Sequence, residues 1–178
     1  MHEAQTNFLV RMKERFPDSF RNSKVLEVGS LDINGTIRVL FENCEYVGVD
    51  VGEGPCVDVV CSGHEYDAPD NSFDTVVSSE CFEHNPYWKE TFANMHRVCK
   101  PGGVVMFTCA TDGRPEHGTN RTQAWASRLT VAIGWGDYYK NLNSNDFETS
   151  FNLSEMFESY EFSVEIFSHD LYFYGVKK

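Results

Sequence analysis

The hydrophobic residues of this chain fall into short apolar runs separated by amphipathic or polar segments. Compact valine-rich runs bounded by polar or glycine residues predict buried strands at residues 24–28, 45–50, 56–61, 72–79 and 104–110. Apolar residues that recur every three or four positions predict helices at residues 3–16, 35–43 and 87–100. Strands that alternate with helices in this way indicate a mostly parallel sheet with helices on both faces.

The pattern changes in the last third of the chain. Residues 111–152 are rich in Gly, Asn, Thr and aromatic residues and show no clear period. A short helix is predicted at 153–160, followed by strands at 162–168 and 171–178. The turn between these strands is too short for a parallel return, so they must form an antiparallel hairpin. We therefore expect one α/β domain over residues 1–178, with a seven-stranded, Rossmann-like sheet.

Composition narrows the functional classes. The chain has 178 residues, 41% hydrophobic and 24% charged, with a formal net charge of -12. This acidity argues against a surface that follows nucleic-acid phosphates and against docking on anionic lipid. The chain opens without a signal peptide, and no apolar run approaches the roughly 20 residues that a membrane span needs. We expect a cytoplasmic protein that binds neither nucleic acid nor membrane.

The cysteines indicate a reducing environment. No Cys-x-x-Cys pair occurs, and no zinc-type group of close Cys and His residues is visible. Most of the six lie in apolar stretches, which favours small buried thiols over disulfides or metal ligands. We therefore expect no metal site. The six are Cys44, Cys56, Cys61, Cys81, Cys99 and Cys109.

Two successive predicted strands end on residues suited to a ligand. Gly29 follows the first strand and allows a sharp turn with no Cβ in the way of a bound molecule. Gly35 opens the next predicted helix, whose free N–H groups favour an anionic group. Asp50 ends the second strand, where a carboxylate can accept hydrogen bonds from a ribose diol. These features favour a nucleoside-bearing cofactor at the carboxyl edge of the sheet.

Five segments in order resemble the class I S-adenosylmethionine-dependent methyltransferases. "VLEVG" resembles their first motif, "YVGVD" their second and "NSFDTVVSS" their fourth. "ECFEHNPYW" resembles the Glu-His that often follows, and "MHRVCKPGGVVMFTC" the helix, Pro-Gly-Gly and strand after it. The resemblance covers residues 24–110, which we expect to be the cofactor-binding core.

The resemblance implies a cofactor, S-adenosylmethionine, and a product, S-adenosylhomocysteine. By its position in the family's motifs, Glu27 is expected to help hold the methionine ammonium and Asp50 to bind the ribose hydroxyls. Residues after the third strand are expected to face the adenine. The implied cofactor-binding residues are Glu27, Gly29, Ser30, Leu31, Asp50, Val51, Ser62, Gly63, His64 and Ser79.

The sequence also departs from the family pattern. The usual Gly-x-Gly-x-Gly loop is replaced by "GSLDING", and Ser62 stands where an acid often faces the adenine. The Asn/Asp-Pro-Pro-Tyr motif of DNA amino-methyltransferases is missing. The acidic composition likewise favours a small-molecule or metabolite-like acceptor over nucleic acid. The polar segment over residues 111–152 suggests a carbohydrate or other biosynthetic intermediate.

The acceptor side is predicted to involve Glu80, His84 and His117, together with residues 111–152 as a substrate-covering insertion. His117 and His84 are candidate general bases. A solvated surface role is equally open for His117, and a helix-start histidine satisfied by its neighbours is at least as open for His84. Two other readings of the whole chain are a nicotinamide-dependent oxidoreductase and a non-catalytic S-adenosylmethionine-binding partner protein. The absence of Gly-x-Gly-x-x-Gly disfavours the first, and the oligomeric state is not predicted.

Overall fold

The computed structural model describes residues 3–178 and contains a seven-stranded sheet of order β3-β2-β1-β4-β5-β7-β6. The first five strands pair in parallel, and β7 pairs antiparallel with both β5 and β6. This confirms the predicted sheet and its C-terminal hairpin. The strands are β1 (Lys24–Val28), β2 (Glu45–Asp50), β3 (Val59–Val60), β4 (Phe73–Ser79), β5 (Cys99–Ala110), β6 (Phe157–Glu165) and β7 (Asp170–Lys177).

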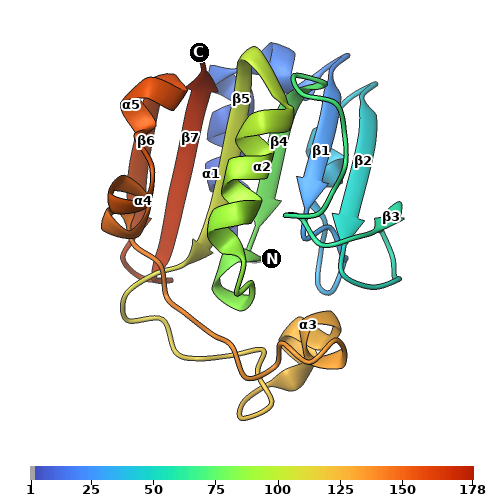
Figure 1. Ribbon diagram of the computed structural model, residues 1–178, viewed down its shortest axis with the longest axis vertical. Helices are drawn as coiled ribbons and strands as arrows, with labels where there is room; N and C mark the ends of the chain where they lie inside the picture. The colour runs from blue at the N-terminus through green and yellow to red at the C-terminus, as the bar shows by residue number, and fades with distance from the viewer. Residues whose placement is uncertain (1–2) are drawn as a thin grey trace.

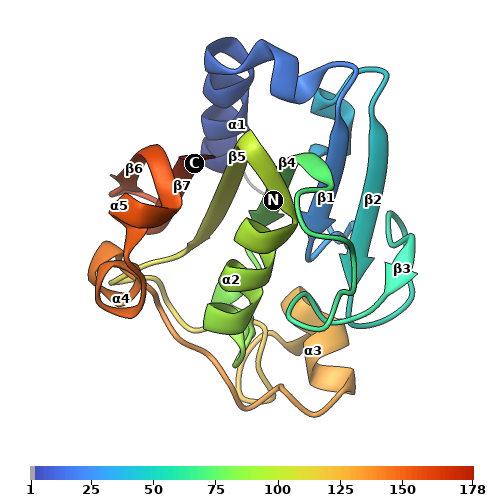
Figure 2. The same cartoon turned by 45° about the horizontal axis from the view of Figure 1, so that its top comes forward.

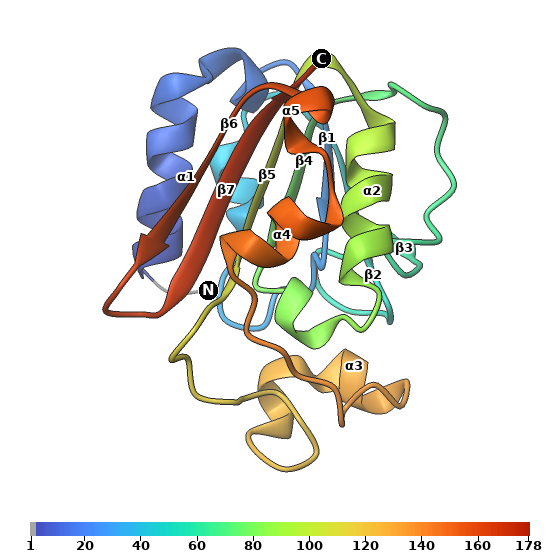
Figure 3. The same cartoon turned by 60° about the vertical axis from the view of Figure 1, so that its left-hand side comes forward.

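Helices cover both faces of this sheet. In Figure 3, α1 packs on one face and α2 and α4 on the other. The α-helices are α1 (Glu3–Arg15), α2 (Trp88–Val98), α3 (Arg128–Ala132), α4 (Ser144–Ser150) and α5 (Leu153–Met156). Four 3-10 turns complete the described elements, namely η1 (Pro17–Phe20), η2 (Ile37–Leu40), η3 (Phe82–His84) and η4 (Ala124–Ser127). Within residues 3–178, no helix is both long enough and apolar enough to cross a membrane.

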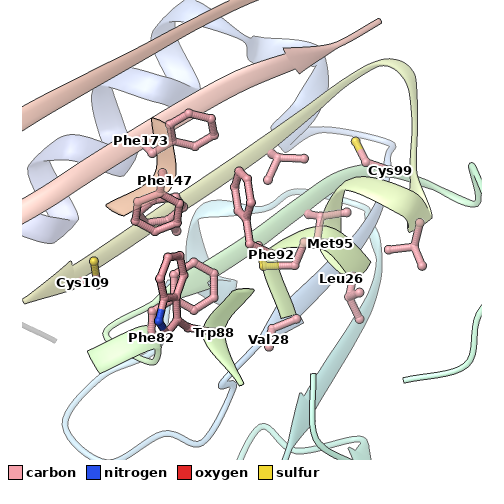
Figure 4. Packing of buried hydrophobic residues seen from close by; sticks show 14 of the residues in the cluster. Leu26, Val28, Phe82, Trp88, Phe92, Met95, Cys99, Cys109, Phe147 and Phe173 are labelled. Atoms are coloured by element: carbon pink, nitrogen blue, oxygen red, sulfur yellow. The ribbon is translucent and has the colours of Figure 1, made fainter. Parts of the chain in front are cut away.

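A group of stacked phenylalanines forms the centre of the core on the α2 face (Figure 4). The ring centroid of Phe107 on β5 lies 4.7 Å from that of Phe147 and 5.1 Å from that of Phe173. Phe92 of α2 meets Phe147 at 5.3 Å. Aromatic pairs at such distances add stabilisation beyond the apolar area that they bury. The group ties α2, α4, β5 and β7 into one unit.

The helix α4 corrects the expectation of an irregular segment over residues 111–152. Asn143 accepts from the N–H of Asp146, and the Asp146 carboxylate accepts from the N–H of Asn143. This reciprocal cap satisfies two free donors and starts the helix. Phe147 is fully buried in the core, so only the chain before Asn143 crosses the site, and that part contains η4 and α3 between irregular stretches.

Three other predicted elements are shorter or shifted. The helix expected at 35–43 is only the single turn η2, because β-branched Ile37 and Val39 and the glycine before them disfavour a longer helix. The strand expected at 56–61 pairs with β2 only through Val59 and Val60. The last helix ends at Met156, since Phe157 already inserts into the core and begins β6.

The parallel strands point their carboxyl ends toward one edge of the sheet, which is the lower edge in Figure 1. The segment that carries α3 lies beyond the same edge (Figures 1 and 2). Its two ends meet beside the sheet, where the Leu142 N–H donates to the carbonyl of Ala110 at 2.9 Å. The fold therefore places residues 111–141 across the strand ends.

Candidate functional site

A cavity of about 440 Å³ lies at the carboxyl ends of the parallel strands. Its lining comes from four parts of the chain. They are α1, the loop after β1, the ends of β2 and β4, and the segment that crosses the sheet edge. Predicted site residues that line it are Glu27, Gly29, Ser30, Leu31, Asp50, Ser79, Glu80, His84 and His117.

Glu27 is the most buried acid on the cofactor side of this cavity. Its carboxyl group is 3% exposed and accepts a hydrogen bond of 2.8 Å from the Tyr46 hydroxyl. Burial raises the pKa of Glu27 to about 8, against the opposing effects of Tyr46 and Arg38. The guanidinium of Arg38 lies 4.5 Å from the centroid of the Tyr46 ring and pairs with Asp58. This chain of contacts holds Glu27 facing the cavity.

The loop after β1 brings its backbone close to the end of β2. The carboxylate of Asp50 accepts from the N–H groups of Leu31 at 2.9 Å and Val51 at 2.8 Å. Burial raises the pKa of Asp50, and these two backbone donors oppose that rise. Gly29 has φ +80°, and a Cβ there would lie 2.7 Å from the Cβ of Cys81. Only glycine fits this turn without strain.

These residues fit a nucleoside-bearing cofactor. Ser30 lines the cavity, and its buried Oγ atom has no hydrogen-bond partner within the described chain. A buried hydroxyl left in this state is costly, so it favours a polar ligand. Asp50 retains unused lone pairs on both oxygens, which suits the paired hydroxyls of a ribose. The loop after β1 therefore still lines a cavity suited to the cofactor, although it lacks the usual glycines.

The segment that crosses the sheet edge roofs the cavity. Leu129 of α3 packs on the backbone of Gly52, where a Cβ would lie 2.8 Å from the Leu129 Cδ2 atom. Arg128 reaches Gly54 in the same way, at 3.8 Å from the corresponding Cβ position. The Trp125 side chain lines the cavity although 65% of its surface is exposed, so it lies at the rim.

The opposite end of the cavity is acidic and holds one arginine. Glu80 has φ +52°, which turns its side chain off the end of β4 toward Thr108 and Arg114. Arg114 also pairs with the fully buried Asp170 at 2.9 Å. Burial, with Asp170 adding to it, raises the pKa of Glu80 to about 7. A partly ionised carboxyl and a guanidinium thus face the cavity together.

Two histidines lie beside these charges. The rings of His84 and His117 are 4.9 Å apart, edge to face, and Tyr139 packs against both. Burial, helped by His117, lowers the pKa of His84 to about 3, and burial lowers the pKa of His117. Gly118 permits the contact, since a Cβ there would lie 2.6 Å from the His84 ring. Both imidazoles are therefore neutral at pH 7.

Four predicted cofactor-binding residues do not line the cavity, and their assignment stays a prediction. The half-buried Val51 donates its N–H to Asp50. The Ser62 hydroxyl donates to Glu65 at 2.6 Å, and a Cβ on Gly63 would lie 2.5 Å from Val28. The His64 ring stacks on Tyr87 with centroids 4.3 Å apart, and its buried Nδ1 has no partner within the described chain.

Sequence reasoning missed some of the lining. Gln5 on α1 is buried and lines the cavity. Leu129 lines it from α3, beyond the carboxyl ends of the strands. The sequence predicts Tyr46 only as a strand residue, although its hydroxyl donates a hydrogen bond to Glu27. The glycines at 52 and 54 were the available signal for a close approach of another segment.

Fold and site together define an α/β domain that binds a nucleoside-bearing cofactor at the carboxyl edge of its sheet. Residues 26–107 match the protein family described as "Methyltransferase domain". Over 51 residues the chain is 39% identical to phosphoethanolamine N-methyltransferase 2 of Caenorhabditis elegans. That stretch is 29% of this chain and 12% of the nematode protein.

Solved structures support the same fold. Phosphoethanolamine N-methyltransferase 2 of Haemonchus contortus, in complex with S-adenosyl-L-methionine, matches with a TM-score of 0.66 and 17% identity. The match covers 96% of this chain and 52% of that chain, so this chain spans about half the length of the nematode enzyme. The 1,6-didemethyltoxoflavin-N1-methyltransferase of Burkholderia thailandensis, with bound S-adenosylhomocysteine, matches with a TM-score of 0.61 and 14% identity. That match covers 100% of this chain and 92% of the bacterial one.

Residues 26–107 therefore match a methyltransferase domain, and the whole chain has the fold of methyltransferases whose structures contain S-adenosylmethionine or S-adenosylhomocysteine. The family match contains Glu27, Asp50 and Glu80, so the motifs that carried the resemblance also build the observed cavity. These matches favour a methyltransferase fold over that of a nicotinamide-dependent oxidoreductase.

Proposed function

We propose that the chain transfers the methyl group of S-adenosylmethionine to a small polar molecule inside the roofed cavity. The observation that supports this most directly is the continuity of the cavity. One space is lined by Glu27 and Asp50 at one end and by Glu80, Arg114 and His117 at the other. Its volume of about 440 Å³ falls within the size range of small-molecule sites.

The bound cofactor supplies an activated methyl group on a positively charged sulfur. The protein supplies position and excludes water, which are the main requirements of an in-line displacement. Asp50 accepts hydrogen bonds from the ribose hydroxyls, and Glu27 faces the methionine ammonium. The roof over the strand ends, closed by Leu129 on Gly52, removes water from the cavity.

The acceptor is bound at the charged end of the cavity. Glu80, His84 and His117 are the groups that we place against the acceptor, with Arg114 holding Glu80 in position. A neutral imidazole can take a proton from the acceptor or bind a metal ion, and the buried Glu83 beside His84 favours the second use. The relatives named above methylate phosphoethanolamine and a toxoflavin precursor, which are small polar molecules.

The net charge and the free thiols support a proposal for the cellular compartment and the class of acceptor. All six cysteines are free, which suits the reducing cytoplasm. A net charge of -12 disfavours a nucleic-acid acceptor, because affinity for phosphate backbones comes mainly from Lys and Arg. We therefore place the reaction in the cytoplasm, on a metabolite.

The test combines cofactor binding with turnover. Calorimetry with S-adenosylhomocysteine should give one site per chain, and Asp50→Ala should weaken binding by roughly 1–3 kcal/mol through lost hydrogen bonds. Asp67→Ala, at an exposed position outside the cavity, is the matched control and should bind normally. Transfer of labelled methyl from S-adenosylmethionine to a panel of phosphorylated, amino and carbohydrate metabolites then separates an enzyme from a passive binder. Tight cofactor binding with no transfer to any compound would favour the partner-protein reading.

A further inference from the structure

The acceptor end of the cavity holds a cluster that methyl transfer by positioning does not require. Glu83, His84 and His117 each offer one ligand atom, and these atoms all lie within 4.8 Å of one another. Glu83 is 0% exposed and His84 is 4% exposed. Neither Glu83 carboxylate oxygen nor the His84 Nδ1 has a hydrogen-bond partner within residues 3–178. A buried carboxyl without a partner is expensive unless a cation or a proton satisfies it.

From this cluster we propose that Glu83, His84 and His117 bind a divalent transition-metal ion beside the acceptor. Two imidazole nitrogens and one carboxylate oxygen form a donor set that zinc, cobalt, iron or manganese accepts, with further coordination positions left open. Ligand atoms around such an ion lie roughly 3–4 Å apart, so the three side chains need to close by about 1 Å.

The surroundings of the two histidines suit this role. The His117 Nδ1 lies 3.1 Å from the carbonyl of Pro115, to which a proton on Nδ1 donates. That bond leaves the lone pair of Nε2 free, which is the usual arrangement around a metal-bound histidine.

The backbone also builds the cluster in advance. Gly118 has φ +65°, and a Cβ there would lie 3.2 Å from the His84 Nδ1. The loop can therefore bring His117 against His84 only with glycine at this position. The Lys140 N–H donates to the Glu83 carbonyl at 2.9 Å and ties the far end of the same segment to η3. Both ends of the crossing segment thus converge on the cluster.

The chemical role of the ion rests on the proposed methyl transfer. His84 and His117 line the cavity, so an acceptor oxygen can take an open coordination position. A hydroxyl bound in this way loses its proton to water more readily. Its oxygen then forms the bond to the methyl carbon, while the methyl–sulfur bond breaks and its electron pair stays on sulfur. This favours an acceptor with a hydroxyl or another oxygen ligand.

Cobalt(II) titration of the chelator-treated protein tests the site without any acceptor. We expect one equivalent of Co²⁺ to bind with visible d–d bands, without the near-ultraviolet band of a cobalt–thiolate bond, and to be displaced by Zn²⁺. Glu83→Gln, which keeps the side-chain shape, and His117→Ala, in the half-buried loop, should each weaken Co²⁺ binding at least tenfold. His169→Ala changes a histidine outside the cluster and should leave Co²⁺ affinity unchanged.

Three results overturn the proposal: no binding at millimolar Co²⁺, a thiolate band, or unchanged affinity in both cluster variants. Calorimetry with S-adenosylhomocysteine on the same variants confirms that they fold, because none of the three substitutions touches the cofactor end. If Glu83→Gln fails that check, His117→Ala decides alone. Cofactor binding and methyl transfer that persist without metal would remove the ion's role and leave the proposed function standing.

Discussion

Binding of the cofactor should release a proton from Glu27. The carboxyl group is buried on β1, and burial raises its pKa to about 8. Asp50 and Asp58 raise that pKa further, whereas the Tyr46 hydrogen bond and the Arg38 guanidinium lower it. At pH 7 the group is therefore mostly protonated, and ionising it costs about 1.4 kcal/mol, which is one pH unit of difference. The methionine ammonium of the cofactor favours the ionised form and displaces that proton.

Below pH 8 the affinity for S-adenosylhomocysteine should therefore rise about tenfold for each pH unit. Calorimetry at pH 6 and pH 7, in two buffers of different ionisation enthalpy, measures both the affinity and the protons released. We expect close to one proton per bound cofactor, and we expect the release to vanish in Glu27→Gln. Tyr46→Phe removes a contact that lowers the Glu27 pKa, so it should shift the profile to higher pH. An affinity that is flat between pH 6 and 7, or a release that persists in Glu27→Gln, would refute the reasoning.

Three further outcomes follow from contacts described above. Gly29→Ala should destabilise the fold more than Gly102→Ala in urea unfolding. Both positions have positive φ, which costs an alanine roughly 1–2 kcal/mol, but only a Cβ at position 29 would clash with Cys81. Equal losses of unfolding free energy in the two variants would contradict the clash. Phe147→Ala should cost about 3–5 kcal/mol if α4 belongs to the core, and a loss below 1 kcal/mol would return that segment to the loop. The pKa of Glu27 is raised in the fold, so its contribution to stability is complete below pH 4.5 and is lost as the pH rises toward 8. The unfolding free energy of the unmutated protein should therefore fall relative to that of Glu27→Gln between pH 4.5 and pH 8.

The sheet and the cofactor end of the cavity were predictable because short-range rules determine them. The apolar period marks the strand ends, and Gly29 and Asp50 lie where those ends line the cavity. The seven strands and the antiparallel hairpin are confirmed on the same grounds. The strands β4 and β5 are parallel neighbours, so the segments that follow them begin at the same edge of the sheet. This explains why Glu80, His84 and His117 line one cavity.

The remaining features depend on contacts between distant segments. No local pattern indicates that Leu129 will pack on Gly52, or that Tyr46 will support Glu27 from the neighbouring strand. The helix α4 did carry a signal, the Asn143 and Asp146 cap, but its seven residues are too few for a clear period. The burial of the Glu83 carboxylate, whose oxygens have no hydrogen-bond partner within the described chain, is likewise visible only when the crossing segment is in place.

The hydrogen bond between Leu142 and Ala110 divides the chain into two modules with separate tasks. Residues 24–110 and the C-terminal strands β6 and β7 form the sheet, and the cofactor end of the cavity lies within residues 24–110. Residues 111–141 leave and rejoin that frame at neighbouring points. Because the cost of closing such an excursion grows only slowly with its length, it can lengthen, shorten or change sequence while the frame persists. His117 and Leu129 both belong to the excursion, so the choice of acceptor and the closure of the cavity can evolve together. A change in this excursion would therefore alter one side of the proposed acceptor end, while Glu80 and His84 stay on the frame.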